Sequence, residues 1–322
     1  MLGYLILGVF FVLVMVLASG VAMDAIEHLA KKYSLNKLFF STILIGLSAA
    51  LPEIGIALSA GFENKPLIAL GNVYGANLAN LGLVVGIAVI VAGVVPIVGE
   101  YVRGSLWVTL GAIILPYMLM LDGGLSRLDG LILLLGYLLY LNYVVKTNGI
   151  IVKQKKNLKR LEKVSKEEIM TPVSSSLVML VLGLATILVS ALFLVRLVGS
   201  IAIDLKVSDF WAGIIFLSLG TTLPEIFGGI ESDKKFTSLL VVEKLLGSVV
   251  INSTLVIGVL AIIRPISTNE TLASGLTGLF TVITLGLFWL FSKSKRKLSR
   301  WEGVVLVGVY MMFAGLMLLT AR

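Results

Sequence analysis

Long apolar runs separated by short polar breaks fill almost the whole chain of 322 residues. A helix needs about 20 apolar residues to cross the hydrocarbon core of a bilayer, and run after run reaches that length. Ten spans are expected, at residues 2–23, 37–60, 66–95, 101–121, 126–145, 173–200, 208–230, 237–264, 270–292 and 301–320. The short alternating segments of a membrane β-barrel do not occur in the sequence. The apolar runs therefore predict an all-α membrane protein with ten transmembrane helices.

Composition agrees with a membrane class and removes several kinds of chemistry. Hydrophobic residues make up 58% of the chain and charged residues 14%, against roughly 25% charged in a typical soluble domain. The chain has no cysteine and a single histidine, His28, which excludes disulfides, thiol catalysis and a multi-histidine metal site in one chain. His28 lies in a polar helix end, where we expect a solvated surface position. No cofactor is expected.

One hydrophilic stretch divides the chain into two halves. Between Lys146 and Thr171 it carries eight Lys and Arg residues, and five predicted spans lie on each side of it. An odd number of spans per half reverses the orientation of the second half. We therefore expect a first five-helix repeat at 1–145, a basic cytoplasmic linker at 146–172, and a second, inverted five-helix repeat at 173–322.

The basic residues predict how the chain sits in the membrane. With the N-terminus outside, twenty of the 26 Lys and Arg residues fall in inner loops and six fall outside. Cytoplasmic loops of membrane proteins carry such an excess. This indicates a multi-pass protein of the cell membrane with both termini outside and the central linker in the cytoplasm. The net charge of +8 has the same origin, so the lipid bilayer and not nucleic acid is the expected partner, and we expect a monomer.

A short motif occurs twice at a constant offset. Leu51-Pro52-Glu53-Ile54 returns 172 residues later as Leu223-Pro224-Glu225-Ile226, and the offset also matches Gly75 with Gly247 and Asn80 with Asn252. Each copy places one carboxylate and one carboxamide in an otherwise apolar segment. A carboxylate in hydrocarbon is costly and by default indicates a functional site. A second, less similar pair of segments accompanies the repeat: Arg127-Leu-Asp129-Gly130 and Arg300-Trp-Glu302-Gly303.

The chemistry of these residues predicts a cation site. Proline removes a backbone donor, so we expect helices 2 and 7 to be broken at Pro52 and Pro224, at the centre of the protein, with carbonyls freed one turn earlier. Carboxylates, carboxamides, hydroxyls and carbonyls are hard oxygen ligands that suit Ca²⁺, with Na⁺ or protons as competitors. Two ionised Glu side chains balance one divalent cation or two monovalent ones. Competition for one carboxylate pair would produce exchange.

The paired motifs resemble the two α-repeats of the cation/Ca²⁺ antiporter superfamily, and most of all its prokaryotic sodium/calcium exchangers. The resemblance rests on Leu51-Pro52-Glu53, Gly75-Ala76-Asn77 and Asn80, with Thr221 to Glu225, Gly247-Ser248 and Asn252. It implies that the first and sixth spans slide over the core to alternate access. It also implies a set of ligands: Glu53, Glu225, Asn80 and Asn252 for Ca²⁺; Glu53 and Glu225 again for Na⁺ or H⁺; the hydroxyls of Thr221, Thr222 and Ser248 for Na⁺; and backbone carbonyls near Leu47 and Ser218.

Two departures from that family leave the coupling ion open. Ala49, Ala50 and Ala76 stand where sodium/calcium exchangers usually carry Thr or Ser, and Glu243-Lys244 replaces the usual Gly-Asn. The resulting expectation is an antiporter that moves Ca²⁺ in exchange for Na⁺ by alternating access. A Ca²⁺/H⁺ antiporter with the same site is the alternative, and a cation channel is a weaker one. An enzyme is not expected, because no activated nucleophile or acid/base pair is apparent.

Overall fold

The computed structural model describes residues 2–32, 37–96, 100–158, 173–231, 235–267, 271–295 and 297–320. Within these ranges the chain forms ten helical segments, in agreement with the number expected. They are α1 (Leu2–Lys32), α2 (Lys37–Phe62), α3–η1–α4 (Pro66–Ala79, Asn80–Val84, Val85–Ala92), α5 (Glu100–Leu119), α6 (Arg127–Leu158), α7 (Val173–Leu205), α8–η3–α9 (Asp209–Ala212, Gly213–Leu217, Ser218–Glu231), α10–η4–α11 (Lys235–Ile251, Asn252–Val256, Ile257–Ile263), α12 (Thr271–Lys295) and α13 (Arg300–Thr320).

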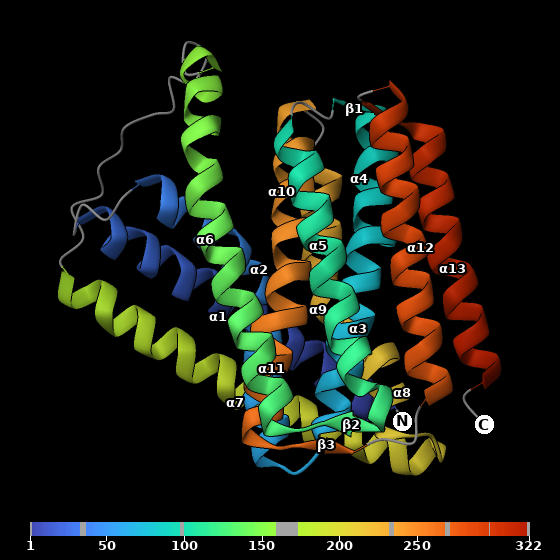
Figure 1. Cartoon of the computed structure of the whole chain (residues 1–322). Coiled ribbons are helices and arrows are strands. Elements are labelled where there is room, and N and C mark those ends of the chain that lie inside the picture. The colour runs from blue at the N-terminus through green and yellow to red at the C-terminus, as the bar shows by residue number, and fades with distance from the viewer. Residues whose placement is uncertain are drawn as a thin grey trace.

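The helices have the length and composition of membrane spans. Seven described stretches are long and apolar enough to cross a bilayer, and three shorter apolar helices complete the set. The fifth helix runs on to Leu158, so the first part of the expected linker is helical. The remainder of that linker, 159–172, lies outside the described residues. Most helices stand together in one bundle, while α1 and α7 lie against each other as an inclined pair on one side of it (Figure 1).

The expected breaks at the two prolines are not present. Helix α2 runs without interruption through Pro52, and α9 continues through Pro224. A membrane helix tolerates proline where packed neighbours and side-chain donors satisfy the freed backbone groups. The irregular turns occur instead as π-helical segments, η1 and η4, which begin at the matched residues Asn80 and Asn252. A third, η3, precedes α9.

Two short strand pairs join the halves at opposite ends of the bundle. Strand β1 (Val94–Pro96) pairs antiparallel with β4 (Lys297–Ser299), and β2 (Gly124–Leu125) pairs with β3 (Ile266–Ser267). The first pair lies at the top of the bundle in Figure 1, and the second lies at the bottom beside both termini. These strands of two or three residues were not expected for an all-α chain, because they exist only as contacts between distant segments.

Matched glycines hold the halves together. A Cβ on Gly86 of α4 would lie 2.9 Å from the carbonyl oxygen of Gly303 in α13, and one on Gly258 of α11 would lie 3.0 Å from that of Gly130 in α6. Each contact therefore requires a residue without a side chain. The third span, in the first half, packs on the tenth span, in the second half. The eighth span, in the second half, packs on the fifth span, in the first half.

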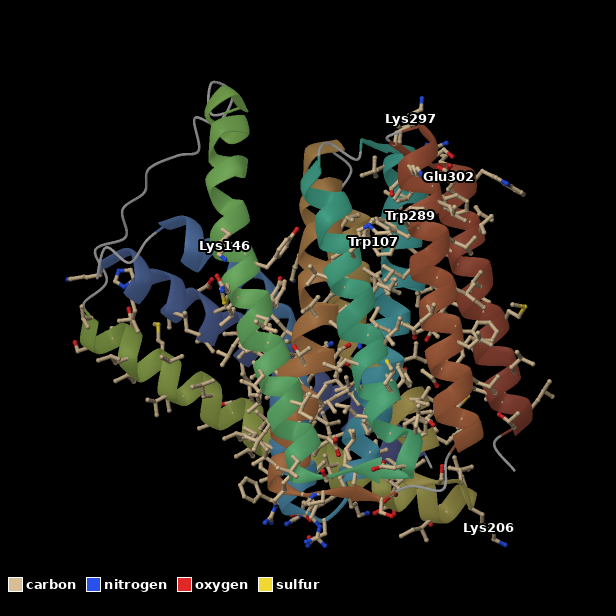
Figure 2. All side chains as sticks on the ribbon, in the orientation of Figure 1. Trp107, Lys146, Lys206, Trp289, Lys297 and Glu302 are labelled. Carbon is tan, nitrogen blue, oxygen red and sulfur yellow. The ribbon has the colours of Figure 1, made fainter. Side chains whose placement is uncertain are left out.

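The less similar pair of repeated segments, at 127–130 and 300–303, forms two equivalent helix starts. Asp129 accepts hydrogen bonds from the backbone N–H and hydroxyl of Ser126 at 2.7 and 2.6 Å. Glu302 accepts the same two bonds from Ser299 at 2.6 and 2.9 Å. A carboxylate that binds the exposed donors of a first turn stabilises the helix start. Figure 2 places Glu302 and Lys297 at the β1–β4 end of the molecule and Lys206 at the other end.

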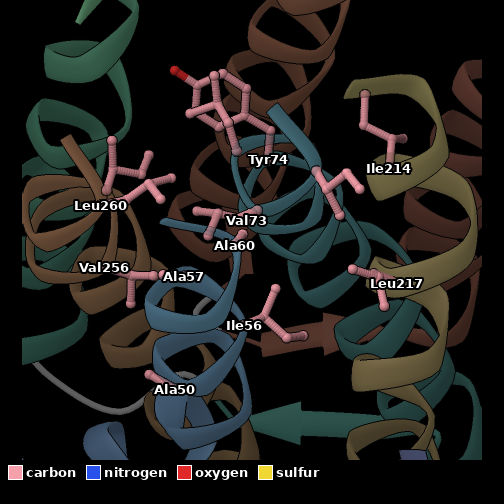
Figure 3. Close-up of a cluster of buried hydrophobic side chains, with 14 of the residues drawn as sticks. Ala50, Ile56, Ala57, Ala60, Val73, Tyr74, Ile214, Leu217, Val256 and Leu260 are labelled. Atoms are coloured by element: carbon pink, nitrogen blue, oxygen red, sulfur yellow. The ribbon is translucent and has the colours of Figure 1, made fainter. Parts of the chain in front are cut away.

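The core packs two elements of the second half against α2. Ala57 of α2 lies near Val256 of η4, Ala50 lies further along the same helix, and Ile56 points toward the side of Leu217 in η3 (Figure 3). All five belong to one cluster of buried residues. The single histidine differs from expectation: His28 is partly buried, and its Nδ1 lies 2.9 Å from the hydroxyl of Ser176, which links α1 to α7.

Candidate cation-binding site

Glu53 lies deep in the helical bundle with its carboxyl group incompletely paired. Its side chain on α2 is 2% exposed, and within the described part of the chain no hydrogen-bond partner reaches its Oε2 atom. The Thr221 side chain lies beside this carboxyl group, and Glu225 is near enough to repel it electrostatically. The structure thus brings together the two acidic residues that the repeat predicted.

Further unpaired oxygens come from both repeats. Among the described side chains, Asn80 Oδ1, Asn252 Oδ1 and Ser248 Oγ are buried without a hydrogen-bond partner, as is Glu53 Oε2. A buried polar atom without a partner costs about 1–3 kcal/mol, so such atoms rarely accumulate without a reason. A fifth buried atom without a partner in the described part of the chain, Asn72 Nδ2, is a donor and cannot bind a cation. The four oxygens without bound donors are atoms that a cation can satisfy. Their donor chemistry suits a hard cation such as Ca²⁺ or Na⁺.

Asn77 orients the amide of Asn252 across the repeat boundary. Asn252 donates through Nδ2 to Asn77 Oδ1 at 3.2 Å, and Asn77 donates through its own Nδ2 to Ser253 Oγ at 2.9 Å. These two bonds fix which end of the Asn252 amide is free, and the free end is the oxygen. Asn77 was not among the ligands predicted from the sequence. The available signal was three Asn residues, with Asn72 and Asn80, in one otherwise apolar span.

The predicted hydroxyl ligands are buried together on one side. Thr221 and Thr222 of α9 are 2% and 1% exposed, and Ser248 of α10 is fully buried. The Ser218 carbonyl, predicted as a free ligand, accepts hydrogen bonds from Thr222 at 2.8 Å and Thr221 at 3.3 Å. It therefore already has two donors in this structure. Leu47, the other carbonyl candidate, lies within α2 and is partly buried.

The first repeat offers no hydroxyl at the matching positions. Ala50 and Ala76 are fully buried where the second repeat has Thr222 and Ser248. Asn72 accepts a bond of 3.5 Å from Thr221 and so reaches across to the second repeat. The site is consequently symmetric in its carboxylates and carboxamides and asymmetric in its hydroxyls.

Glu225 differs from Glu53 in its surroundings. Its side chain is 15% exposed, and the ammonium group of Lys244 lies 3.4 Å from its Oε1 atom. Glu225 and Lys244 line a cavity of about 270 Å³ between α1 and the bundle. Asp24 and Thr221 line the same cavity. Water and ions can thus approach Glu225 from the α1 side. Neither Asp24 nor Lys244 was predicted as a site residue, although Lys244 was noted as a departure from the expected motif.

Comparison with known proteins gives a consistent result over the full length. Residues 2–146 and 175–319 match the sequence pattern of the sodium/calcium exchanger protein family. The membrane protein MJ0091 of Methanocaldococcus jannaschii is 29% identical over 88% of both chains. The sodium/calcium exchanger MaX1 of Methanosarcina acetivorans is 23% identical over 96% of both. The solved structure of the sodium-calcium exchanger NCX_Mj soaked with Na⁺ and Sr²⁺ superposes with a TM-score of 0.64, at 26% identity, over 98% of this chain and 97% of that one.

Proposed function

The chain belongs to the sodium/calcium exchanger protein family, and from this membership we propose that it moves Ca²⁺ across the cell membrane in exchange for Na⁺ by alternating access. It is a multi-pass membrane cation antiporter of that family and not an enzyme. The observation that carries the proposal is the set of buried, unpaired oxygens contributed by both repeats. Such a set is costly in an apolar core unless a cation occupies it.

The proposed Ca²⁺ ligands are the four matched polar residues, Glu53, Asn80, Glu225 and Asn252. Their two carboxylates balance the charge of one Ca²⁺ ion, while the amide oxygens complete an all-oxygen shell. The same carboxylates would take up Na⁺ in its turn. Thr221, Thr222, Ser248 and the carbonyls of Leu47 and Ser218 are the proposed further Na⁺ ligands.

The proposed mechanism uses the two halves in opposite orientations. The repeats, with boundaries at 1–145 and 173–322, are proposed to be inverted, with both termini outside and the linker in the cytoplasm. Corresponding strands of the two halves, β1 and β3, lie at opposite ends of the bundle, which supports this arrangement (Figure 1). The inclined pair α1 and α7 would move against the rest and expose the site to each side alternately.

Exchange against protons is a second candidate, favoured by one observation. The first repeat has fully buried alanines, Ala50 and Ala76, in place of hydroxyl ligands, so one proposed Na⁺ site is incomplete. A proton needs only a carboxylate, which Glu53 and Glu225 supply. The two candidates share the Ca²⁺ site and differ only in the ion that replaces Ca²⁺.

Flux through reconstituted protein tests the proposal directly. Proteoliposomes are loaded with Ca²⁺, and its release is followed after an imposed Na⁺ gradient or an imposed pH gradient. We expect Na⁺ to drive release, and we expect Glu53→Gln and Glu225→Gln each to abolish it. Removal of one negative charge leaves a divalent cation uncompensated in a low-dielectric site, which costs several kcal/mol. Lys146→Met, which changes an exposed residue on α6, serves as the folded control.

Each contrary result has a defined meaning. Release driven only by the pH gradient would replace Na⁺ with H⁺ as the coupling ion. Ca²⁺ flux that persists in both Gln variants would overturn the proposed site. Single-channel currents far above transporter turnover would indicate a channel in place of an antiporter.

A further inference from the structure

Lys244 places an ammonium group against the candidate site. It lies on α10 one turn before Ser248 and two turns before Asn252, so the three residues share one helix face. Its Nζ atom is 3.4 Å from Glu225 Oε1, and its side chain is 34% exposed. The matched residue of the first repeat is the neutral Asn72. The ammonium group is thus a feature of one half only.

A second carboxylate lines the cavity that Lys244 and Glu225 share. The cavity of about 270 Å³ is lined by Asp24 of α1 as well as by Glu225 and Lys244. The three side chains carry two negative charges and one positive charge. A lysine has a flexible four-carbon stem, so its ammonium group can change partner within a cavity without any change in the backbone.

Occupancy of the site alters which partner is favoured. With no cation bound, Glu53 and Glu225 repel each other, and the Lys244 ammonium group neutralises one of them. A divalent cation between the two carboxylates brings two positive charges next to that ammonium group and repels it. The remaining carboxylate in the cavity, Asp24, then becomes the more favourable partner.

We propose that Lys244 is a tethered counter-ion, which holds Glu225 while the site is empty and transfers to Asp24 when a cation binds. The proposal rests on the proposed function, because the entering cation is the transported Ca²⁺ or Na⁺. Asp24 belongs to α1, which is packed along α7 in the inclined pair. The transfer therefore links occupation of the site to the position of α1.

Opposite effects of two single substitutions on Ca²⁺ affinity test the transfer. Lys244→Met removes the internal competitor for Glu225, so the dissociation constant of Ca²⁺ falls, by roughly two- to fivefold for a partly exposed ion pair. Asp24→Asn removes the acceptor of the displaced ammonium group, so the dissociation constant rises by a similar factor. In the double variant the effect of Asp24→Asn disappears, because no ammonium group needs an acceptor. Calorimetric titration of the purified full chain with CaCl₂ measures all four proteins.

Controls separate this role from a structural one. Lys244→Arg keeps the charge and is expected to keep the wild-type affinity, while Lys146→Met repeats the substitution on an exposed lysine of α6. Should Lys244→Met not fold, Lys244→Gln removes the charge with less change in polarity. Equal shifts for Asp24→Asn in the presence and absence of Lys244 would overturn the proposal. So would an unchanged affinity in both charge-removing variants.

A second readout does not depend on Ca²⁺ transport. The chain has no cysteine, so Met23→Cys on α1 gives a unique thiol at the wall of the cavity. We expect the rate of its reaction with a water-soluble maleimide to change on addition of Ca²⁺ or Na⁺, and the change to vanish when Lys244→Met is added. A change of equal size with and without Lys244, or no change with either ion, overturns the proposal. Wild-type protein that binds Na⁺ and not Ca²⁺ would refute the proposed function while the labelling still tests Lys244.

Discussion

Asn77 shows how one residue can set the chemistry of another. An amide side chain offers either an oxygen or two N–H donors, and only the oxygen is a ligand for a cation. Asn77 accepts the N–H of Asn252 and is itself held by Ser253, so the Asn252 oxygen is left without a partner. The position matched to Asn77 in the second repeat is Val249, which has no such function. The site thus depends on a contact that the repeat does not duplicate.

Substitution of Asn77 by Val, the residue of the matched position, is expected to weaken Ca²⁺ binding. Loss of the bond to Asn252 frees its amide to rotate, which costs about 1 kcal/mol, or roughly a fivefold rise in the dissociation constant. Titration of the purified variant with Ca²⁺ measures the change. Ser253→Ala removes only the outer bond and is expected to have a smaller effect. An Asn77→Val protein that binds Ca²⁺ as tightly as wild type would show that the Asn252 orientation is irrelevant.

The helical elements place the site by close backbone approach. A Cβ on Gly75 of α3 would lie 2.5 Å from Ser218 Oγ and 3.0 Å from the Ile214 carbonyl oxygen. This contact sets α3 directly against η3 and the start of α9, which carries Thr221 and Glu225. The π-helical segments η1 and η4 begin at the matched residues Asn80 and Asn252. Such wide turns occur often at functional sites, because they redirect one side chain relative to the rest of the helix.

Replacement of Gly75 by Ala is expected to destabilise the protein and reduce transport. The added methyl group overlaps atoms of α9, and insertion of a methyl group into a packed interior costs about 1–3 kcal/mol. Thermal unfolding of the purified protein measures the first effect, and Ca²⁺ flux measures the second. Gly111→Ala on α5 is the matched control, since a Cβ there would meet nothing within 4 Å. Equal melting temperatures for the two variants would contradict the packing argument.

For the molecule as a whole, a cavity and two polar contacts lie toward opposite ends of the inclined pair of helices. The cavity beside Glu225 lies between α1 and the bundle. Near the other end of the inclined pair, Arg196 of α7 binds Glu63, which follows α2, at 2.8 Å, and the Ser59 hydroxyl donates to the Leu188 carbonyl at 3.4 Å. These contacts tie α7 to the bundle on the side where we propose the outer surface lies. We interpret these two contacts as holding α7 against the bundle, so they must break when α7 moves to the alternate conformation.

Loss of the Glu63 charge is expected to weaken the contact between α7 and the bundle. The hydrogen bond from Arg196 lowers the pKa of Glu63 below its usual value of 4.5, so the ion pair contributes stability at neutral pH and loses it as the pH falls through the lowered pKa. Glu63→Gln should mimic the acid state at every pH. The probe is a thiol introduced as Ala191→Cys on α7. Ala191 is fully buried against Gly55 of α2, so the thiol should react with an impermeant maleimide only when α7 separates.

Asp204→Asn removes a different exposed carboxylate from α7 and should leave the labelling rate of this thiol unchanged. A rate in Glu63→Gln equal to that of the parent protein at neutral pH would show that the ion pair does not hold α7. Because Arg196 is exposed and Glu63 is partly exposed, high salt should weaken the pair as well.

Much of the architecture follows from local sequence, and particular residues show why the rest does not. The ten helical segments could be predicted because bilayer thickness sets the length of an apolar run. Glu53 and Glu225 could be predicted as a pair because a carboxylate is conspicuous in an apolar segment. The continuous helices at Pro52 and Pro224 could not, since the tolerance of proline depends on neighbours that the local sequence does not specify. Nor could β1–β4 or β2–β3, each of which joins distant parts of the chain.

The number of spans, the two related halves and the residue types of the candidate cation site were therefore decided by the chain alone, because length, polarity and repetition are local properties. Tertiary packing decided which oxygen atoms are free. It turned the Asn252 amide through Asn77 and brought Lys244 to Glu225. Both contacts depend on distances between side chains of different helices. The contact between Asn77 and Asn252 joins residues 175 positions apart in the sequence. Such distances are set when helices pack, since neither their rotation nor their crossing is specified by hydropathy.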